Sequence, residues 1–181
     1  MPGMSAGETL ARLVVDVPDW PEPGVVFKDI TPLLSDHQAF AEVVDALAAP
    51  ARDDVGTATV DYVLGMEARG FILAAPVALA LGVGFVPVRK AGKLPRETYA
   101  ESYALEYGQA TLEMHRDALS PGSRVLLVDD VLATGGTVAA TARLVERAGA
   151  TVEHVSVLMD LSFLPGRATI GDLPLTSLLT I

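Results

Sequence analysis

The stretch VLLVDDVLATGGT, residues 125–137, determines the fold expected for this chain. An apolar strand is predicted at RVLLVD (124–129), and a helical pattern follows at GTVAATARLVERAG (136–149). Asp129 and Asp130 stand between the two, at the predicted carboxyl end of the strand. Ligands bind beyond the carboxyl ends of strands in open α/β sheets, so we expect a functional site here.

The same rhythm of apolar strands and helices extends outward from this stretch, and it predicts an α/β domain with a mostly parallel sheet flanked by helices. The chain of 181 residues suits one domain over residues 1–181. Asp36 is a candidate helix cap, and alternation around Gly108 predicts a hairpin. The predicted helices cover 6–16, 36–50, 70–82 and 136–149, and the predicted strands cover 61–66, 84–89, 124–129 and 151–160.

Composition restricts the classes of function. The net charge of -10 disfavours binding to nucleic acid or to an anionic membrane. There is no cysteine, which excludes thiolate chemistry and disulfides, and no apolar run has the length of a membrane span. The start, MPGMSAGETL, lacks the layout of a signal peptide, so a cytoplasmic protein is expected. The three histidines are far apart in the sequence, which disfavours a structural metal site.

The residues after the strand suit a phosphorylated sugar. A helix N-terminus presents unpaired N–H groups and a partial positive charge, and glycines let the backbone approach an anion closely. Ala133, Thr134, Gly135, Gly136 and Thr137 therefore form a candidate phosphate loop. Asp129 and Asp130 are candidate acceptors for sugar hydroxyls and candidate ligands of magnesium through water. The alternative is a glycine turn with a threonine cap and solvated aspartates, but the combined pattern favours a ribose 5-phosphate.

The pattern VLLVDDVLATGGT resembles the phosphoribosyl-diphosphate motif of the type I phosphoribosyltransferases. Within that family the chain is similar to the adenine-specific enzymes over nearly its whole length. The segments that carry this similarity are PEPGVVFKDITPLL (21–34), GMEARGFILAAPVALALGVGFVPVRKAGKLP (65–95), ESYALEYGQATLEMHRDAL (101–119), LSFLPGR (161–167) and SLLTI (177–181).

The resemblance implies a fold, a reaction and a set of partners. The fold is the type I phosphoribosyltransferase fold, with a small base-binding hood from about residues 1–35 and a flexible hairpin loop. The reaction is transfer of the 5-phosphoribosyl group from 5-phosphoribosyl 1-diphosphate to adenine, giving AMP and diphosphate in purine salvage. The resemblance also implies a Mg²⁺ cofactor held mainly by the substrate, and a homodimer.

Diphosphate is expected to bind at two segments that the family uses for it. The first is EARG (67–70), with Glu67, Ala68 and Arg69, where relatives often have a cis peptide; Arg69 is expected to face diphosphate or to brace the base pocket. The second is the basic stretch with Arg89, Lys90 and Lys93, whose alternative is a solvated loop. Ala91 stands where many relatives have proline, so a looser loop is expected.

The resemblance places adenine at the turn PGVVFKD (23–29). Phe27 is expected to stack on the purine, with Leu161 or Leu164 on its other face, although core packing is the commoner fate of phenylalanine. The Val26 carbonyl and the Lys28 N–H are expected to read the 6-amino group and N1. Glu106, in the hairpin, is expected to handle the purine proton, and an outward-facing strand residue is its alternative.

Three rival functions follow from the same motif. The nearest is a phosphoribosyltransferase for another purine, such as xanthine. A regulator that senses phosphoribosyl diphosphate without catalysis is disfavoured, because the chain has no room for a DNA-binding module and no basic surface to match. A diphosphokinase needs a nucleoside triphosphate site, and GMEARG (65–70) lacks the lysine of a Walker A motif, with Phe71 in its place.

Overall fold

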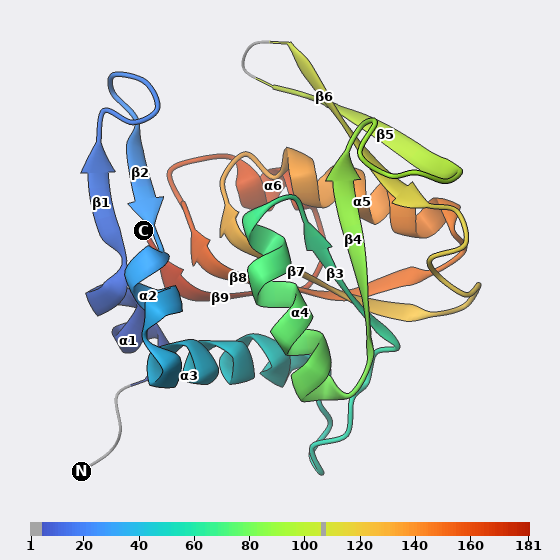
Figure 1. Ribbon diagram of the computed structural model, residues 1–181, viewed down its shortest axis with the longest axis horizontal. Helices are drawn as coiled ribbons and strands as arrows, with labels where there is room; N and C mark the ends of the chain where they lie inside the picture. The colour runs from blue at the N-terminus through green and yellow to red at the C-terminus, as the bar shows by residue number, and fades with distance from the viewer. Residues whose placement is uncertain (1–4, 106–107) are drawn as a thin grey trace.

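The computed structural model describes residues 5–105 and 108–181. Within these residues the centre is a seven-stranded sheet of order β5-β6-β4-β3-β7-β8-β9 (Figure 1). The five strands from β4 to β9 in that order run parallel, and β6 and β5 add an antiparallel edge. The strands are β3 (Tyr62–Met66), β4 (Gly84–Lys90), β5 (Thr98–Ala104), β6 (Gln109–His115), β7 (Arg124–Leu132), β8 (Thr151–Asp160) and β9 (Leu175–Thr180). The predicted α/β fold with a mostly parallel sheet is confirmed.

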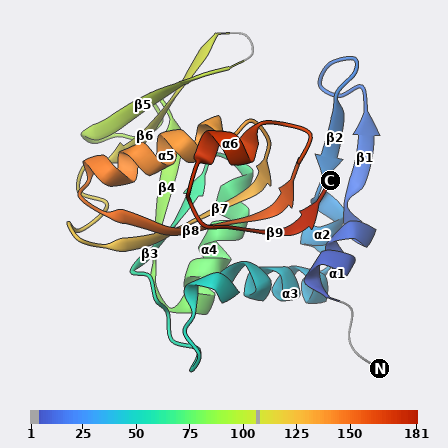
Figure 2. The same ribbon diagram turned by 180° about the vertical axis from the view of Figure 1, so that it is seen from behind.

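Helices cover both faces of the sheet, as Figures 1 and 2 show from opposite sides. One face is covered by α3 and α4, and the other by α5 and α6. The described residues hold α1 (Ala6–Leu13), α2 (Thr31–Ser35), α3 (His37–Ala48), the 3-10 turn η1 (Ala49–Ala51), α4 (Arg69–Leu81), α5 (Gly136–Arg147) and α6 (Gly166–Ile170). No described helix has the length and apolarity that crossing a membrane requires.

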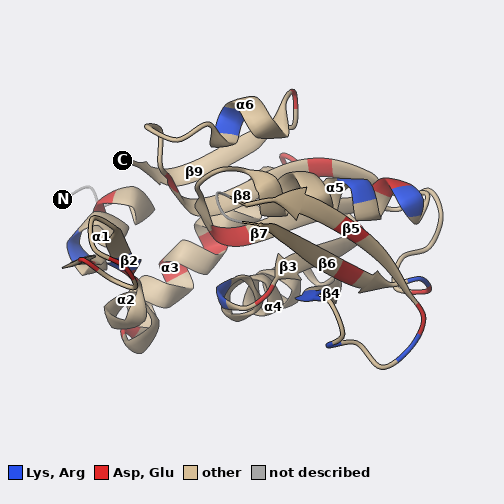
Figure 3. Ribbon diagram, turned by 90° about the horizontal axis from the view of Figure 1, so that it is seen from above, with Lys and Arg blue, Asp and Glu red and all other residues tan. Residues whose placement is uncertain are grey.

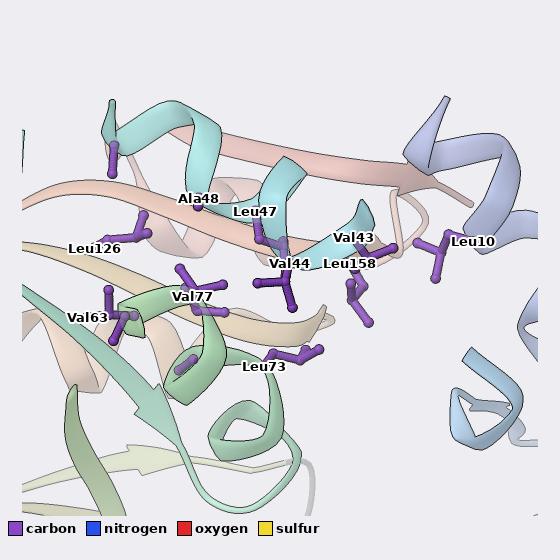
Figure 4. Close-up of a cluster of buried hydrophobic side chains, with 14 of the residues drawn as sticks. Leu10, Val43, Val44, Leu47, Ala48, Val63, Leu73, Val77, Leu126 and Leu158 are labelled. Atoms are coloured by element: carbon purple, nitrogen blue, oxygen red, sulfur yellow. The ribbon is translucent and has the colours of Figure 1, made fainter. Parts of the chain in front are cut away.

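Strand β7 joins the two hydrophobic cores. Successive side chains of a strand point to opposite faces, so Leu126 and Val128 enter the core under α3 and α4, while Val125 and Leu127 enter the core under α5. All four are fully buried. Figure 4 shows the first core, where Leu126 lies among side chains from α3, α4 and β8. The first half of β7 is therefore held from both sides.

The N-terminal region departs from the prediction. The helix predicted over 6–16 ends at Leu13, and β1 (Val15–Pro18) follows it. β1 pairs antiparallel with β2 (Val26–Asp29), so the segment expected to be a turn, PGVVFKD, is mostly a strand. The alternating valines of VDVP satisfy a strand pattern as well as a helical one, and pairing with β2 decides between them.

Strand β7 also runs further than predicted. It was expected to end at Asp129, but it continues to Leu132 along β8. Its pairing with β3 ends at Val128, opposite Gly65. The two aspartates therefore lie within the strand, just beyond its last pair with β3, where the start of α4 packs against Asp129. The predicted cap is confirmed, because Asp36 accepts the Ala39 N–H at 3.0 Å.

Candidate active site

The site lies beyond the carboxyl ends of β3 and β7. The β1–β2 ribbon and the β5–β6 hairpin both extend past the sheet at this end and flank it (Figure 1). Seen from above in Figure 3, an acidic segment of β7 lies beside a basic segment at the start of α4. The region thus holds charges of both signs, although the chain as a whole is acidic.

The two aspartates of β7 have different surroundings. Asp130 is buried, and its Oδ2 lies 2.7 Å from Nη2 of Arg69. Asp129 accepts the N–H of Asp130 at Oδ1, at 2.9 Å. Burial raises the pKa of Asp129 well above its usual value, and the neighbouring charge of Asp130 raises it further. A nearby cation would favour the ionised form of this carboxyl group.

Glycine at position 70 lets α4 approach this pair of carboxylates. A Cβ atom there would lie 3.0 Å from Oδ1 of Asp129 and 3.2 Å from the carbonyl oxygen of Val128. Both distances are tighter than ordinary van der Waals contact, so a side chain would push Asp129 or the helix aside. The placement of Asp129 therefore depends on the absence of a side chain at Gly70.

Arg69 connects three segments of the site. Besides its ion pair with Asp130, it donates from Nη1 to the Lys28 carbonyl at 3.2 Å. Its guanidinium carbon also lies 4.7 Å from the centre of the Phe27 ring. Arg69 thus holds β2 against the end of β7, and which of its two expected roles it plays stays a prediction.

The two segments expected to bind diphosphate lie together. Glu67 accepts the Lys90 N–H at 2.9 Å and pairs with Nε of Arg89 at 3.3 Å. Arg89 in turn donates to the Lys93 carbonyl at 3.3 Å. The side chain of Glu67 therefore orders the basic loop, and its negative charge makes it a poor direct ligand for an anion. The peptide between Glu67 and Ala68 is cis.

The basic loop has more order than expected. The Ala91 N–H donates to the Thr111 carbonyl at 3.0 Å, a bond that proline in this position is unable to make. The expectation that Ala91 loosens the loop is therefore not matched by its contacts. Arg96, the last cation of the stretch, forms an ion pair with Asp117 instead of turning toward the loop.

The candidate phosphate loop leads directly into α5. Gly135 is the helix N-cap with φ of 82°, and a Cβ atom there would meet the Gly166 carbonyl oxygen at 2.7 Å. Both the left-handed backbone and the close packing require glycine. The first N–H groups of α5 have no partner within the helix, and phosphate binding to them stays a prediction.

A cavity of about 540 Å³ opens beside this loop. Four residues expected at the base, Val26, Lys28, Leu161 and Leu164, line it together with Thr134 of the phosphate loop. The other lining residues are Gly24 and Val25, which lie in the predicted segment PGVVFKD, and Asp16 and Phe163, which were not predicted. Phe163 lies in the segment LSFLPGR, but its high exposure, 70%, has no signal in the sequence.

The Phe27 side chain projects from the face of β2 opposite to that of Val26 and Lys28. Its ring lies 4.6 Å from the ring of Trp20 in an edge-on arrangement, and the Arg69 guanidinium covers it. The expected stacking of Phe27 on a purine thus stays a prediction. Glu106, the expected proton-handling residue, lies outside the described residues.

The open edge of β2 carries the backbone groups expected to read the base. The Val25 carbonyl accepts from the Trp20 N–H on the β1 side, at 3.2 Å. The backbone groups of successive strand residues point to opposite sides, so those of Val26 and Lys28 point away from β1. Pro18, which pairs with Val26, has no N–H to offer it, in agreement with this orientation.

Comparisons with known proteins were consistent with one another. The family model described as "Phosphoribosyl transferase domain" matches residues 33–162. The adenine phosphoribosyltransferase of Nocardioides sp. is 70% identical over 180 residues, which are 99% of this chain and 96% of that protein. The crystal structure of adenine phosphoribosyltransferase from Thermoanaerobacter pseudethanolicus has a TM-score of 0.90 at 45% identity, covering 97% of this chain and 99% of that one.

A further solved structure carries ligands. It is the Saccharomyces cerevisiae adenine phosphoribosyltransferase complexed with adenine and D-2,5-dideoxy-2,5-imino-altritol 1,6-bisphosphate. Its TM-score is 0.91 at 38% identity, covering 96% of this chain and 98% of that one.

The contacts of Glu67 generate a pH-dependent prediction for stability. The Lys90 N–H, followed by the charge of Arg89, holds the pKa of Glu67 below its usual value of 4.5. A depressed folded-state pKa contributes stability above pH 4.5 that is lost as the pH falls through the folded value. We expect Glu67→Gln to lower the free energy of unfolding by about 1–2 kcal/mol at pH 7, and by much less in acid.

Urea unfolding at pH 7 and in acid measures this difference. Glu153→Gln is the matched control, because Glu153 is an exposed glutamate on β8. A Glu67 variant as stable as the control at pH 7, or a loss that persists unchanged in acid, contradicts the role given to this carboxylate.

Proposed function

The chain belongs to the phosphoribosyltransferase family, and from this membership we infer that it is an adenine phosphoribosyltransferase. It transfers the 5-phosphoribosyl group of 5-phosphoribosyl 1-diphosphate to adenine, and the products are AMP and diphosphate. The family model covers most of the chain, and the relatives named above match it over nearly its full length. The adenine bound to the yeast enzyme supports the same choice of base.

One observation carries the assignment of the site. Thr134 lines the 540 Å³ cavity beside β2 and also a second cavity of about 410 Å³ at the start of α5. The base region and the phosphate loop are therefore adjacent spaces separated by one residue. A nucleoside 5′-phosphate has its base and phosphate joined by a ribose, and Asp129 and Asp130 lie on the strand that leads into this loop.

Catalysis in this site consists of positioning and charge stabilisation. As diphosphate leaves, the sugar carbon gains positive character and the diphosphate gains negative charge. Arg89, Lys90 and Lys93 supply cations for the departing group, and Glu67 holds their loop in place. Because these cations are already in place before the reaction, they stabilise the charge that develops in the transition state and lower the activation barrier.

The carboxylates fit a magnesium ion bound mainly by the substrate. Magnesium prefers oxygen ligands and keeps several waters, and Asp129 and Asp130 supply oxygens at the expected ribose position. When bound, Mg²⁺ supplies charge neutralisation for the diphosphate. Asp129 and Asp130 would hold the ion through water and orient the ribose hydroxyls.

Adenine is read by the open edge of β2. The Val26 carbonyl accepts from the 6-amino group, and the Lys28 N–H donates to N1. Leu161 and Leu164 supply apolar contact from across the cavity. Phe27 stacks on the purine, and Arg69 stays paired with Asp130 and braces the strand that carries Phe27. Glu106, from the β5–β6 connection, handles the purine proton as the new bond forms.

Two further features belong to the proposal. A homodimer forms through the outer face of α4, where Ile72 and Leu79 are exposed beside an apolar cavity of about 450 Å³ that Phe40 lines. Exposed apolar clusters of this kind mark protein interfaces. The location is cytoplasmic, and neither nucleic acid nor membrane is a partner, as composition predicts.

The paired aspartates give the first functional test. Asp129→Asn with Asp130→Asn should lower kcat/KM for phosphoribosyl diphosphate on the order of a hundredfold or more, because hydroxyl and magnesium contacts are lost. Steady-state kinetics measure this loss, and circular dichroism checks the fold. The adjacent exposed pair Asp53 and Asp54, changed in the same way, is the control. Near-normal turnover in the Asp129/Asp130 double variant would contradict the role given to these two carboxylates.

Base selectivity gives the second test. With hypoxanthine, carbonyl faces carbonyl and N–H faces N–H at β2, and each mismatch costs about 1–3 kcal/mol. In equal mixtures of adenine and hypoxanthine we expect AMP to exceed IMP by roughly a hundredfold to ten-thousandfold. Lys28→Arg should keep this preference, because backbone atoms do the reading. Comparable amounts of IMP and AMP would refute adenine specificity and favour a broader purine enzyme.

The dimer surface gives the third test. Leu79→Asp places a charge in the proposed interface, so we expect the variant to sediment at the mass of one chain while the unchanged protein sediments at twice that mass. Val55→Asp, at an equally exposed valine in the loop before β3, is the control. Identical sedimentation of all three proteins as monomers, or of all three as dimers, counts against this face as the interface.

A further inference from the structure

Strand β5 is fastened to helix α5 along one face. Tyr99, Glu101 and Tyr103 alternate along the strand and therefore project to the same side. Glu101 pairs with Arg143 at 3.1 Å and with Arg147 at 3.0 Å, two arginines one turn apart on α5. The same arginines donate to the Ser102 and Ala100 carbonyls. The described part of the hairpin is thus built onto the helix that begins in the phosphate loop.

The contact closest to that loop is made by Tyr103. Its ring lies against Gly136, where a Cβ atom would come within 2.5 Å of Cδ2 of the ring. Gly135 requires glycine for its left-handed backbone, but Gly136 is absent from the positions with positive φ among the described residues. Gly136 lacks a side chain for a different reason, because the Tyr103 ring packs directly against it.

A hydrogen bond joins the same tyrosine to the next residue of the loop. Oγ1 of Thr137 donates to the Tyr103 hydroxyl at 3.2 Å. Each hydroxyl has one donor and two acceptor positions, so the bond survives if its direction reverses. A phosphate offers only acceptors, and it would take the donor of Thr137. The Tyr103 O–H then donates to Oγ1 of Thr137, and a chain runs from tyrosine through threonine to phosphate.

We propose that Tyr103 is a positioning residue for the 5′-phosphate, acting through Thr137. This inference rests on the proposed function, which puts phosphate in the Thr134–Thr137 loop. Tyr103 orients the threonine hydroxyl and strengthens it as a donor, since linked hydrogen bonds polarise one another. Tyr103 also lines the 410 Å³ cavity together with Thr134 and Gly136, so its ring forms a wall of the space beside the loop.

The test compares ligands with and without a 5′-phosphate. Tyr103→Phe keeps the ring on Gly136 and removes the hydroxyl. We expect the Kd of AMP, measured by calorimetry, and the KM of phosphoribosyl diphosphate to rise roughly two- to tenfold. The KM of adenine should stay unchanged. Tyr99→Phe, on the same face of the same strand, is the control, and thermal unfolding verifies that each variant folds.

A second background separates positioning from simple packing. Thr137→Val removes the hydroxyl through which Tyr103 acts, so Tyr103→Phe should cause no further change in AMP binding there. The inference is wrong if Tyr103→Phe weakens AMP binding equally with and without the Thr137 hydroxyl. It is also wrong if the variant weakens adenine and AMP equally, or if it changes neither. If the unchanged protein neither binds AMP nor forms it from phosphoribosyl diphosphate, the proposed function itself fails, and this outcome is distinct from the others.

Discussion

The ion pair between Arg69 and Asp130 is the constraint on which the site depends. Asp130 is buried on the central strand, and its carboxylate would be left uncompensated without the arginine beside it. The same guanidinium donates to the Lys28 carbonyl and lies over the Phe27 ring. One side chain therefore ties the start of α4, the end of β7 and the base-binding ribbon into a single arrangement.

The central α/β layers could be predicted because their signals are local. The parallel strands and the helices between residues 61 and 160 each have an apolar pattern, and except for the carboxyl end of β7 they were predicted at nearly their observed bounds. The N-terminal ribbon could not be read in the same way. VDVP extends the apolar pattern of α1, and only its pairing with the distant strand β2 makes it a strand. The extension of β7 beyond its predicted end likewise depends on pairing with a neighbouring strand, β8.

The candidate site shows the same division. The phosphate loop and its carboxylates are adjacent in sequence, so a motif describes them. The lining of the 540 Å³ cavity comes from β1, β2, the turn between them, the loop before α5 and the segment after β8, and Asp16 and Phe163 had no local signal. Glu67 shows a second limit of prediction from sequence. Its position was predicted, but its side chain turns to Lys90 and Arg89, a choice set by hydrogen bonds across two loops.

The open edge of β2 has a consequence for association between copies of the chain. A strand edge with unpaired backbone groups is a template for adding another strand, which leads to aggregation. Here the exposed strand is only four residues long, and an ion pair between Lys28 and Asp16 places charge on it. The Lys28 carbonyl already accepts a hydrogen bond from Arg69. The proposed reading of a base by main-chain atoms needs this edge to stay accessible, and these features keep it accessible while they disfavour the addition of further strands.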